Sequence, residues 1–231
     1  MVKLIIVILI RQEQLQICMD AGEPWGQPGE VYHYSDTGYI LLGEIIEGVT
    51  GQSLGDAVWG LIDRQRLGLS TTWFESIEPQ PKGALDRAHQ YLGDLDVTDF
   101  DPSFDLWGGG GIATSVGDLA IFTRALFTGA VFDDPATLDT MLTTFDGLQA
   151  AADATAGSLP PGAYRMGMWV IDRGDFTIYR HTGFWCTSAT YVPEFDLVIT
   201  GTVNNHFEGA LFDEIEESAI QLIRVYSSQI Q

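Results

Sequence analysis

Residues 185–203 read WCTSATYV (185–192), PEFD (193–196) and LVITGTV (197–203), and this run determines the class of fold. The first and third pieces are rich in β-branched and aromatic residues, a composition that favours strands. Only the four residues 193–196 connect them, and a connection this short joins neighbouring antiparallel strands. We therefore predict an antiparallel strand pair over residues 185–192 and 197–203.

Two further predicted elements flank this pair. Residues 164–171 have a similar strand-like composition and predict a third strand. After residue 203, apolar residues recur at steps of three and four, which predicts an amphipathic helix able to cover the sheet. These residues are Leu211, Ile215, Ala219, Leu222, Ile223 and Tyr226.

The part of the chain before these strands is mostly helical by pattern. Helix-start and helix-stop residues mark five helical segments. They cover residues 13–20 and 39–51, and they follow Ser53, Ser115 and Asp134. Helices, then antiparallel strands and a closing helix, indicate an α+β fold.

We predict three regions: an apolar segment over residues 1–10, a mainly helical domain over 11–150, and a domain of antiparallel strands with a terminal helix over 151–231. The apolar run VKLIIVILI (2–10) is far shorter than the ~20 residues of a membrane-spanning helix. No small-residue cleavage pattern follows it, as would follow a signal peptide. Its β-branched residues favour a buried strand over a truncated signal, and the residues alone indicate no compartment.

Composition excludes several classes of function. The 231 residues include 11 Lys and Arg against 32 Asp and Glu, so the formal net charge is −21. A surface this acidic repels phosphate backbones, which argues against nucleic-acid binding. Four scattered histidines and two cysteines show no metal-ligand spacing, so we predict no metal and no cofactor.

Two short motifs, Tyr34-Ser35-Asp36 and His181-Thr182-Gly183, stand in informative contexts. The first lies in PGEVYHYSDTGYILLGEIIE (28–47), and the second begins HTGF (181–184), with VNN following at 203–205. Between them lies GGIATSVGDLA (110–120). In this order the segments resemble the serine β-lactamase and penicillin-recognising family, which includes class C β-lactamases, D-alanyl-D-alanine carboxypeptidases and esterases. The resemblance implies a β-lactamase/transpeptidase-like fold: a helical domain packed on an antiparallel sheet.

The resemblance also implies roles for individual residues. Tyr34 matches the family tyrosine that relays a proton, a role that near neutral pH needs cations to lower its pKa from ~10. His181 matches the Lys or His that lines the strand side of the cleft. Thr182 and Gly183 match the narrow strand along which a substrate binds, and the backbone N–H of Phe184 matches an oxyanion-hole donor. Tyr34 and His181 are thus the catalytic candidates.

Each motif also has a purely structural interpretation. Tyr34 fits an aromatic residue before a helix, and His181 fits a residue at a strand end. We favour the site because both motifs occur in their expected contexts. Asp36 stands where the family usually has Asn, and an ionised Asp accepts hydrogen bonds but donates none. This favours simple esters over β-lactams and peptides as substrates.

The family's nucleophile pair, Ser-x-x-Lys, has no counterpart here. Lysine occurs only at Lys3 and Lys82, and neither stands three residues after a serine. We therefore expect an N-terminally truncated member, in which acyl transfer on an ester, D-Ala-D-Ala peptide or β-lactam is lost. The alternatives are a non-catalytic binding module and an inactive fragment. The missing strands predict an open sheet edge and self-association. The resemblance alone implies a periplasmic or extracellular protein.

Overall fold

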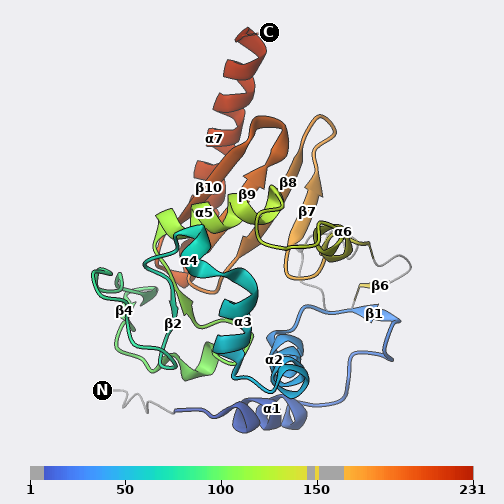
Figure 1. The fold of residues 1–231 in the computed structure, drawn as a ribbon, viewed down its shortest axis with the longest axis vertical. Coiled ribbons are helices and arrows are strands. Elements are labelled where there is room, and N and C mark those ends of the chain that lie inside the picture. The colour runs from blue at the N-terminus through green and yellow to red at the C-terminus, as the bar shows by residue number, and fades with distance from the viewer. Residues whose placement is uncertain (1–7, 145–148, 151–163, 231) are drawn as a thin grey trace. The chain divides into compact units, whose positions relative to one another are not determined.

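The computed structural model describes residues 8–144, 149–150 and 164–230 (Figure 1). Most of the apolar segment 2–10 lies outside the described residues. Near the end of this segment, the Leu9 N–H donates to Ser103 Oγ (2.8 Å). The chain forms two compact units, each assembled from three stretches. Unit 1 comprises Met1–Ala84, Asp99–Thr114 and Phe145–Pro161, and unit 2 comprises Leu85–Thr98, Ser115–Thr144 and Gly162–Gln231. The predicted regions, by contrast, are contiguous.

Unit 1 consists of helices and short strand pairs. Its helices are α1 (Arg11–Asp20), α2 (Asp36–Thr50), α3 (Leu54–Ile62), α4 (Arg64–Leu67) and the 3-10 helix η1 (Pro102–Asp105). Its strands are β1 (Val31–Tyr32), β2 (Trp73–Phe74), β5 (Ile112–Ala113) and β6 (Gln149–Ala150). β1 pairs with β6 in parallel, and β2 pairs with β5 antiparallel.

The helix boundaries of unit 1 follow the predicted caps. Ser53 accepts a hydrogen bond from Asp56 N–H and so caps α3, and Gly51 ends α2 in the left-handed conformation (φ 68°). Glu47 of α2 accepts from the Arg11 guanidinium and from Leu54 N–H (2.9 Å). The hydrogen bond from Arg11 is the main cause that lowers the pKa of Glu47. One carboxylate thus joins α1, α2 and the start of α3.

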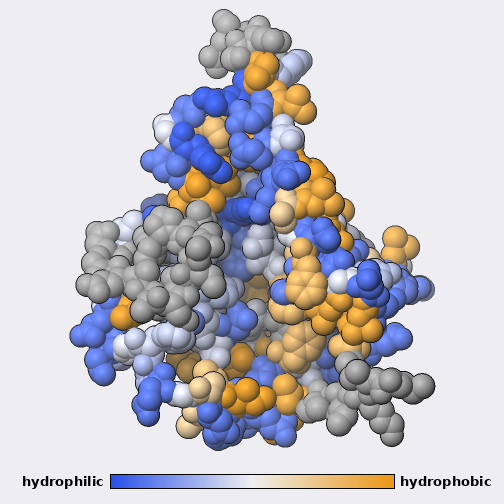
Figure 2. All heavy atoms as spheres, turned by 180° about the vertical axis from the view of Figure 1, so that it is seen from behind, coloured by the Kyte–Doolittle hydropathy of each residue, from blue (hydrophilic) through white to orange (hydrophobic). Residues whose placement is uncertain are grey.

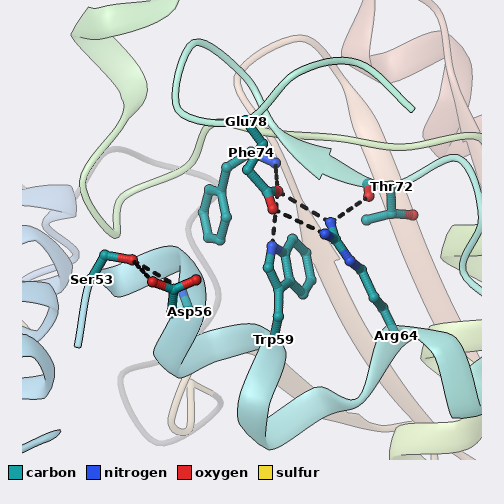
Figure 3. A network of polar contacts seen from close by, with 7 residues as sticks. All are labelled: Ser53, Asp56, Trp59, Arg64, Thr72, Phe74 and Glu78. Atoms are coloured by element: carbon teal, nitrogen blue, oxygen red, sulfur yellow. Dashed lines mark hydrogen bonds and ion pairs between the residues drawn. The ribbon is translucent and has the colours of Figure 1, made fainter. Parts of the chain in front are cut away.

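A second carboxylate, that of Glu78, organises the other side of unit 1 (Figure 3). It accepts from the Trp59 indole N–H (2.8 Å), the Phe74 amide (2.7 Å) and the Arg64 guanidinium (3.0 Å). Arg64 also donates to the carbonyl of Thr72 (3.2 Å) and lies over the Trp59 ring at 4.7 Å. These contacts fasten β2 to α3 and α4.

Replacing Glu78 tests this network. Glu78→Gln replaces the charged carboxylate that accepts from three donors with a neutral amide. We expect the free energy of unfolding to fall by about 1–3 kcal/mol, since hydrogen bonds to charged groups contribute that much. Urea unfolding followed by tryptophan fluorescence measures the loss. The control Glu23→Gln changes an exposed loop residue and should shift stability by less than ~0.5 kcal/mol. Equal stability of the two variants would contradict the assignment.

Unit 2 contains an antiparallel sheet between helices. Its strands are β3 (Tyr91–Leu92), β4 (Leu95–Asp96), β7 (Trp169–Asp172), β8 (Thr177–Thr182), β9 (Thr187–Val192) and β10 (Leu197–Thr202). Its helices are α5 (Val116–Phe127), α6 (Ala136–Met141) and α7 (Gly209–Ile230), with 3-10 turns η3 (Pro193–Phe195) and η4 (His206–Glu208). The sheet order is β10-β9-β8-β7, all antiparallel, and β3 pairs with β4 as a separate hairpin.

The two faces of this sheet pack against different helices. On one face, Phe127 of α5 stacks on Tyr179 of β8 (ring centroids 4.6 Å) and on Tyr191 of β9 (5.4 Å). On the other face, Ile178 and Ile220 belong to one buried apolar cluster. Side chains alternate across a strand, so successive residues of β8 face α5 and α7 in turn.

Helix α7 also carries apolar side chains that do not face the sheet. Leu211, Ile215, Leu222 and Tyr226 are exposed, as is Val225, so the predicted covering face is wrong for the first four residues. The helix instead buries Phe212, Glu216 and Ile220. Figure 2 shows orange residues on the projecting end of α7, just below the grey terminus.

The outer strand β10 pairs only with β9 among the described residues. The self-association expected from an open sheet edge stays a prediction. No helix among the described residues is long and apolar enough to span a bilayer.

The α+β prediction is confirmed, and one strand was missed. The hairpin of β9 and β10 pairs Val192 with Leu197, as the short connection predicted. The described sheet has a further strand, β8, whose sequence does not indicate a strand because Arg180 and His181 interrupt its apolar pattern. His181 and Thr182 therefore lie at the end of strand β8. β7 begins at Trp169, five residues later than predicted.

Candidate functional site

The two predicted motifs belong to different units. Tyr34 and Asp36 lie in unit 1 at the start of α2, and residues 181–184 lie in unit 2 at the end of β8. Each is described within its own unit.

Tyr34 lies beside the first turn of α2. Ser35 is the N-cap in extended conformation, and Asp36 follows in the first turn, where an acidic side chain is favoured by the helix dipole. Tyr34 is 41% exposed. The glycine turn after Trp107 packs closely here: a Cβ on Gly108 would lie 2.4 Å from the carbonyl oxygen of Tyr39. A side chain at that position would therefore displace the turn or the helix.

The surroundings of Tyr34 stabilise the neutral phenol. Partial burial is the largest cause that raises its pKa, followed by the charge of Asp36, and a side-chain hydrogen bond with Asp36 adds to the effect. Tyr32 and Tyr39 raise the pKa of Tyr34 further. A tyrosine that acts as a base near neutral pH needs the opposite influence, from nearby cations. Within its described surroundings Tyr34 is therefore a hydrogen-bonding phenol.

The pKa of Tyr34 gives a direct test. Asp36→Asn removes a negative charge that opposes phenolate formation, so the pKa of Tyr34 should fall towards the ordinary value of ~10. The phenolate absorbance of the variant, compared with Tyr34→Phe in each background, measures the change. Glu44→Gln, on the same helix, should leave it unaltered. An unchanged pKa in Asp36→Asn would show that Asp36 does not act on Tyr34.

His181 lies at the end of β8, beyond the last pair with β7. The β7–β8 ladder ends at Trp169 opposite Arg180, whereas the β8–β9 ladder continues to Thr182 opposite Ser188. By alternation His181 is on the same face as Tyr179. Its Nε2 lies 3.4 Å from the Tyr164 hydroxyl, and the two rings meet edge to face at 6.1 Å. The segment that begins at His181 thus runs past the end of its β7 neighbour.

Residues 183–186 form a tight turn after this segment. The amide of Gly183 donates to the carbonyl of Thr187 (2.8 Å), and the amide of Cys186 donates to the carbonyl of Gly183 (2.9 Å). The amide of Phe184 lies at the first corner of the turn. Cys186 has a left-handed backbone (φ 57°), and its Sγ donates to the carbonyl of Asn205 (3.1 Å). The turn is thereby fastened to the segment that follows β10.

The segment after β10 contributes residues that no sequence motif indicated. His206 Nδ1 lies 2.9 Å from the carbonyl oxygen of Phe184, and the two rings stack at 4.0 Å. Asn205 exchanges two hydrogen bonds of 3.1 Å with the backbone of Gly93, which joins the β3–β4 hairpin to η4. The run VNNHF (203–207) after an apolar strand indicates a turn at the end of that strand. It does not indicate that this turn contacts Phe184 and the β3–β4 hairpin.

Polar contacts on the α7 face hold the end of β8. Arg180 forms ion pairs with Asp213 and with Glu216 (3.3 Å). Glu216 is buried and accepts from the hydroxyls of Ser188 (3.0 Å) and Thr190 (2.9 Å). These contacts fix both strands of the hairpin that carries the turn. Within residues 8–144, 149–150 and 164–230, no three His, Cys, Asp or Glu side chains are placed to hold a metal ion.

Comparisons with known proteins agree on one family. The family model described as Beta-lactamase matches residues 11–221. A protein of Escherichia coli O157:H7 named as a D-alanyl-D-alanine carboxypeptidase is 30% identical over 128 residues, which is 47% of this chain and 29% of that protein.

Solved structures show the same fold. The D-amino acid amidase of Ochrobactrum anthropi SV3, complexed with L-phenylalanine amide, superposes with a TM-score of 0.66 at 22% identity, covering 89% of this chain and 59% of that one. The D-stereospecific amidohydrolase of a Streptomyces species gives 0.67 at 25% identity, with 86% and 57% covered. The chain spans less than two thirds of the length of each of these relatives.

Proposed function

Because the chain belongs to the beta-lactamase family, we propose that residues 181–184 bind the acyl group of small amide, ester or β-lactam ligands. The names of the Escherichia coli and Streptomyces relatives, a carboxypeptidase and an amidohydrolase, indicate reactions at amide bonds. For members of the family that carry the Ser-x-x-Lys pair, these names indicate acyl transfer to the serine followed by hydrolysis.

The observation that carries this proposal is the register at the end of β8. His181 and Thr182 continue past the last β7 pair, at Trp169, while β9 holds their other side. An extended ligand can add alongside such a segment through main-chain hydrogen bonds. The adjoining corner at Phe184 offers a backbone amide, the type of donor that stabilises a developing oxyanion.

We further propose that these 231 residues bind such ligands without covalent turnover. They contain no Ser-x-x-Lys pair, and a hydroxyl nucleophile needs an adjacent base. The raised pKa of Tyr34 points the same way, because it disfavours the phenolate that would accept a proton.

Binding of a fluorescent penicillin tests the proposal. Fluorescence anisotropy should show saturable binding, and intact-mass spectrometry should show no covalent adduct. Thr182→Val and His181→Ala should weaken binding about tenfold, the equivalent of about 1.4 kcal/mol. Thr177→Val, at the opposite end of β8, is the matched control and should bind like the unaltered chain.

Any other outcome of these binding experiments contradicts one part of the proposed function. A covalent adduct would overturn the absence of turnover. Equal weakening by Thr177→Val would show that the variants act through the fold of the sheet. Absence of penicillin binding, together with absence of binding to a chromogenic ester, would overturn the proposed function.

A further inference from the structure

A buried phenol lies beside His181. Tyr164 is 9% exposed and comes five residues before the start of β7, within unit 2. Its backbone forms an antiparallel bridge with Trp169, the first residue of β7, and the two rings meet edge to face at 4.7 Å. The β7–β8 ladder ends at Trp169 opposite Arg180. Tyr164 is therefore anchored where His181 passes beyond the end of β7.

A tight turn fixes the backbone that follows Tyr164. The amide of Arg165 donates to the carbonyl of Met168 (2.7 Å), which closes the turn into β7. The amide of Met166 donates to the carbonyl of Met141 (3.2 Å), the last residue of α6. The turn is thus attached both to β7 and to α6 (Figure 1). The phenol has a defined position before any ligand binds, which is the condition for a group that orients another.

The hydroxyl of Tyr164 contacts the imidazole of His181. Its oxygen lies 3.4 Å from Nε2, and the two ring centroids are 6.1 Å apart in an edge-to-face arrangement. A hydrogen bond of this length is long, and such bonds in ligand-free sites often shorten when the ligand binds. A buried phenol O–H needs an acceptor, and a neutral imidazole has one acceptor nitrogen. The contact supplies that acceptor when Nε2 carries no proton.

The partner of Nε2 decides which hydrogen bond His181 can form with a ligand. A neutral imidazole carries its proton on one nitrogen, and the hydrogen bond made by the other nitrogen selects which one. When the phenol donates to Nε2, the proton lies on Nδ1, and the imidazole donates from Nδ1. With the proton on Nε2, Nδ1 would accept instead. A ligand carbonyl or carboxylate requires the first arrangement, because its oxygens only accept.

A second histidine of unit 2 shows the contrast. His89 Nδ1 lies 2.6 Å from the Asp96 carboxylate, which only accepts when ionised, so this nitrogen carries a proton. The partner of His181 is a hydroxyl, which can donate. The two contacts also involve different ring nitrogens. His89 therefore serves as an internal reference for the protonation of His181.

We propose that Tyr164 is a positioning residue of the candidate site. Its hydroxyl donates to Nε2 of His181, which keeps the imidazole proton on Nδ1 and makes His181 a donor to an acceptor atom of the ligand. The inference rests on the proposed function, in which residues 181–184 bind the ligand. It goes further by assigning the direction of the hydrogen bond at His181 and the residue that sets this direction.

Nitrogen NMR tests the assigned tautomer. In the chain labelled with 15N-histidine, at alkaline pH where a free imidazole is neutral, the shifts of His181 should show a protonated Nδ1 and a bare Nε2. Tyr164→Phe keeps the ring and removes the hydroxyl, so a measurable share of the proton should move to Nε2. Tyr179→Phe, which removes a hydroxyl from the same strand as His181, is the matched control and should leave these shifts unchanged. The signals of His89 should be the same in both variants.

Binding shows whether Tyr164 acts through His181. Tyr164→Phe should weaken binding of the fluorescent penicillin about two- to tenfold, the effect of losing one net hydrogen bond. In His181→Ala the phenol has no imidazole to orient, so the added Tyr164→Phe change should cause no further loss. The two changes should thus be non-additive, as expected for residues that act as one unit. Tyr179→Phe should leave the affinity unchanged in either background.

The outcomes separate this inference from the proposed function. A proton on Nε2 of His181 in the unaltered chain, or unchanged His181 shifts in Tyr164→Phe, would overturn the inference, and continued penicillin binding would leave the proposed function standing. Additive losses in the double variant would also overturn it, because Tyr164 would then act apart from His181. If penicillin does not bind the unaltered chain, both are overturned. Matching amide spectra show that Tyr164→Phe retains the fold; if they differ, the tautomer of the unaltered chain decides.

Discussion

The buried carboxylate of Glu216 holds in place the strands that carry the candidate site. Removing a carboxylate from water costs several kcal/mol unless donors replace the water. Here the hydroxyls of Ser188 and Thr190 and the guanidinium of Arg180 do so. Arg180 is the residue before His181, and Ser188 lies opposite Thr182, so the carboxylate fixes the hairpin from the α7 face. The side chain of His181 lies on the opposite face of β8, the face that it shares with Tyr179.

The same principle organises unit 1, where Glu47 and Glu78 each collect several donors. A chain with 32 acidic and 11 basic residues has few cations for such roles. Arg11 pairs with Glu47, and Arg64 pairs with Glu78. Around Tyr34, partial burial, the charge of Asp36 and two neighbouring tyrosines all raise the pKa of the phenol. The electrostatics of unit 1 therefore favour the neutral form of this phenol.

Local signals predicted much of the fold. The Ser53 and Ser115 caps, the Gly51 stop and the four-residue β9–β10 connection each act within a few residues, so the sequence reports them directly. Strand β8 was missed because its polar side chains are satisfied by distant residues of α7.

The candidate residues at 181–184 could be chosen from their motif, whereas His206 could not. Its contact with Phe184 spans 22 residues of sequence and depends on the turn after β10.

Amide hydrogen exchange with and without benzylpenicillin tests the central claim most directly, because a ligand carbonyl bound at the Phe184 corner protects that amide. The account predicts that exchange slows at residues 182–186 and stays unchanged in the β3–β4 hairpin. Slowing confined to unit 1, or no slowing at saturating ligand, would contradict it.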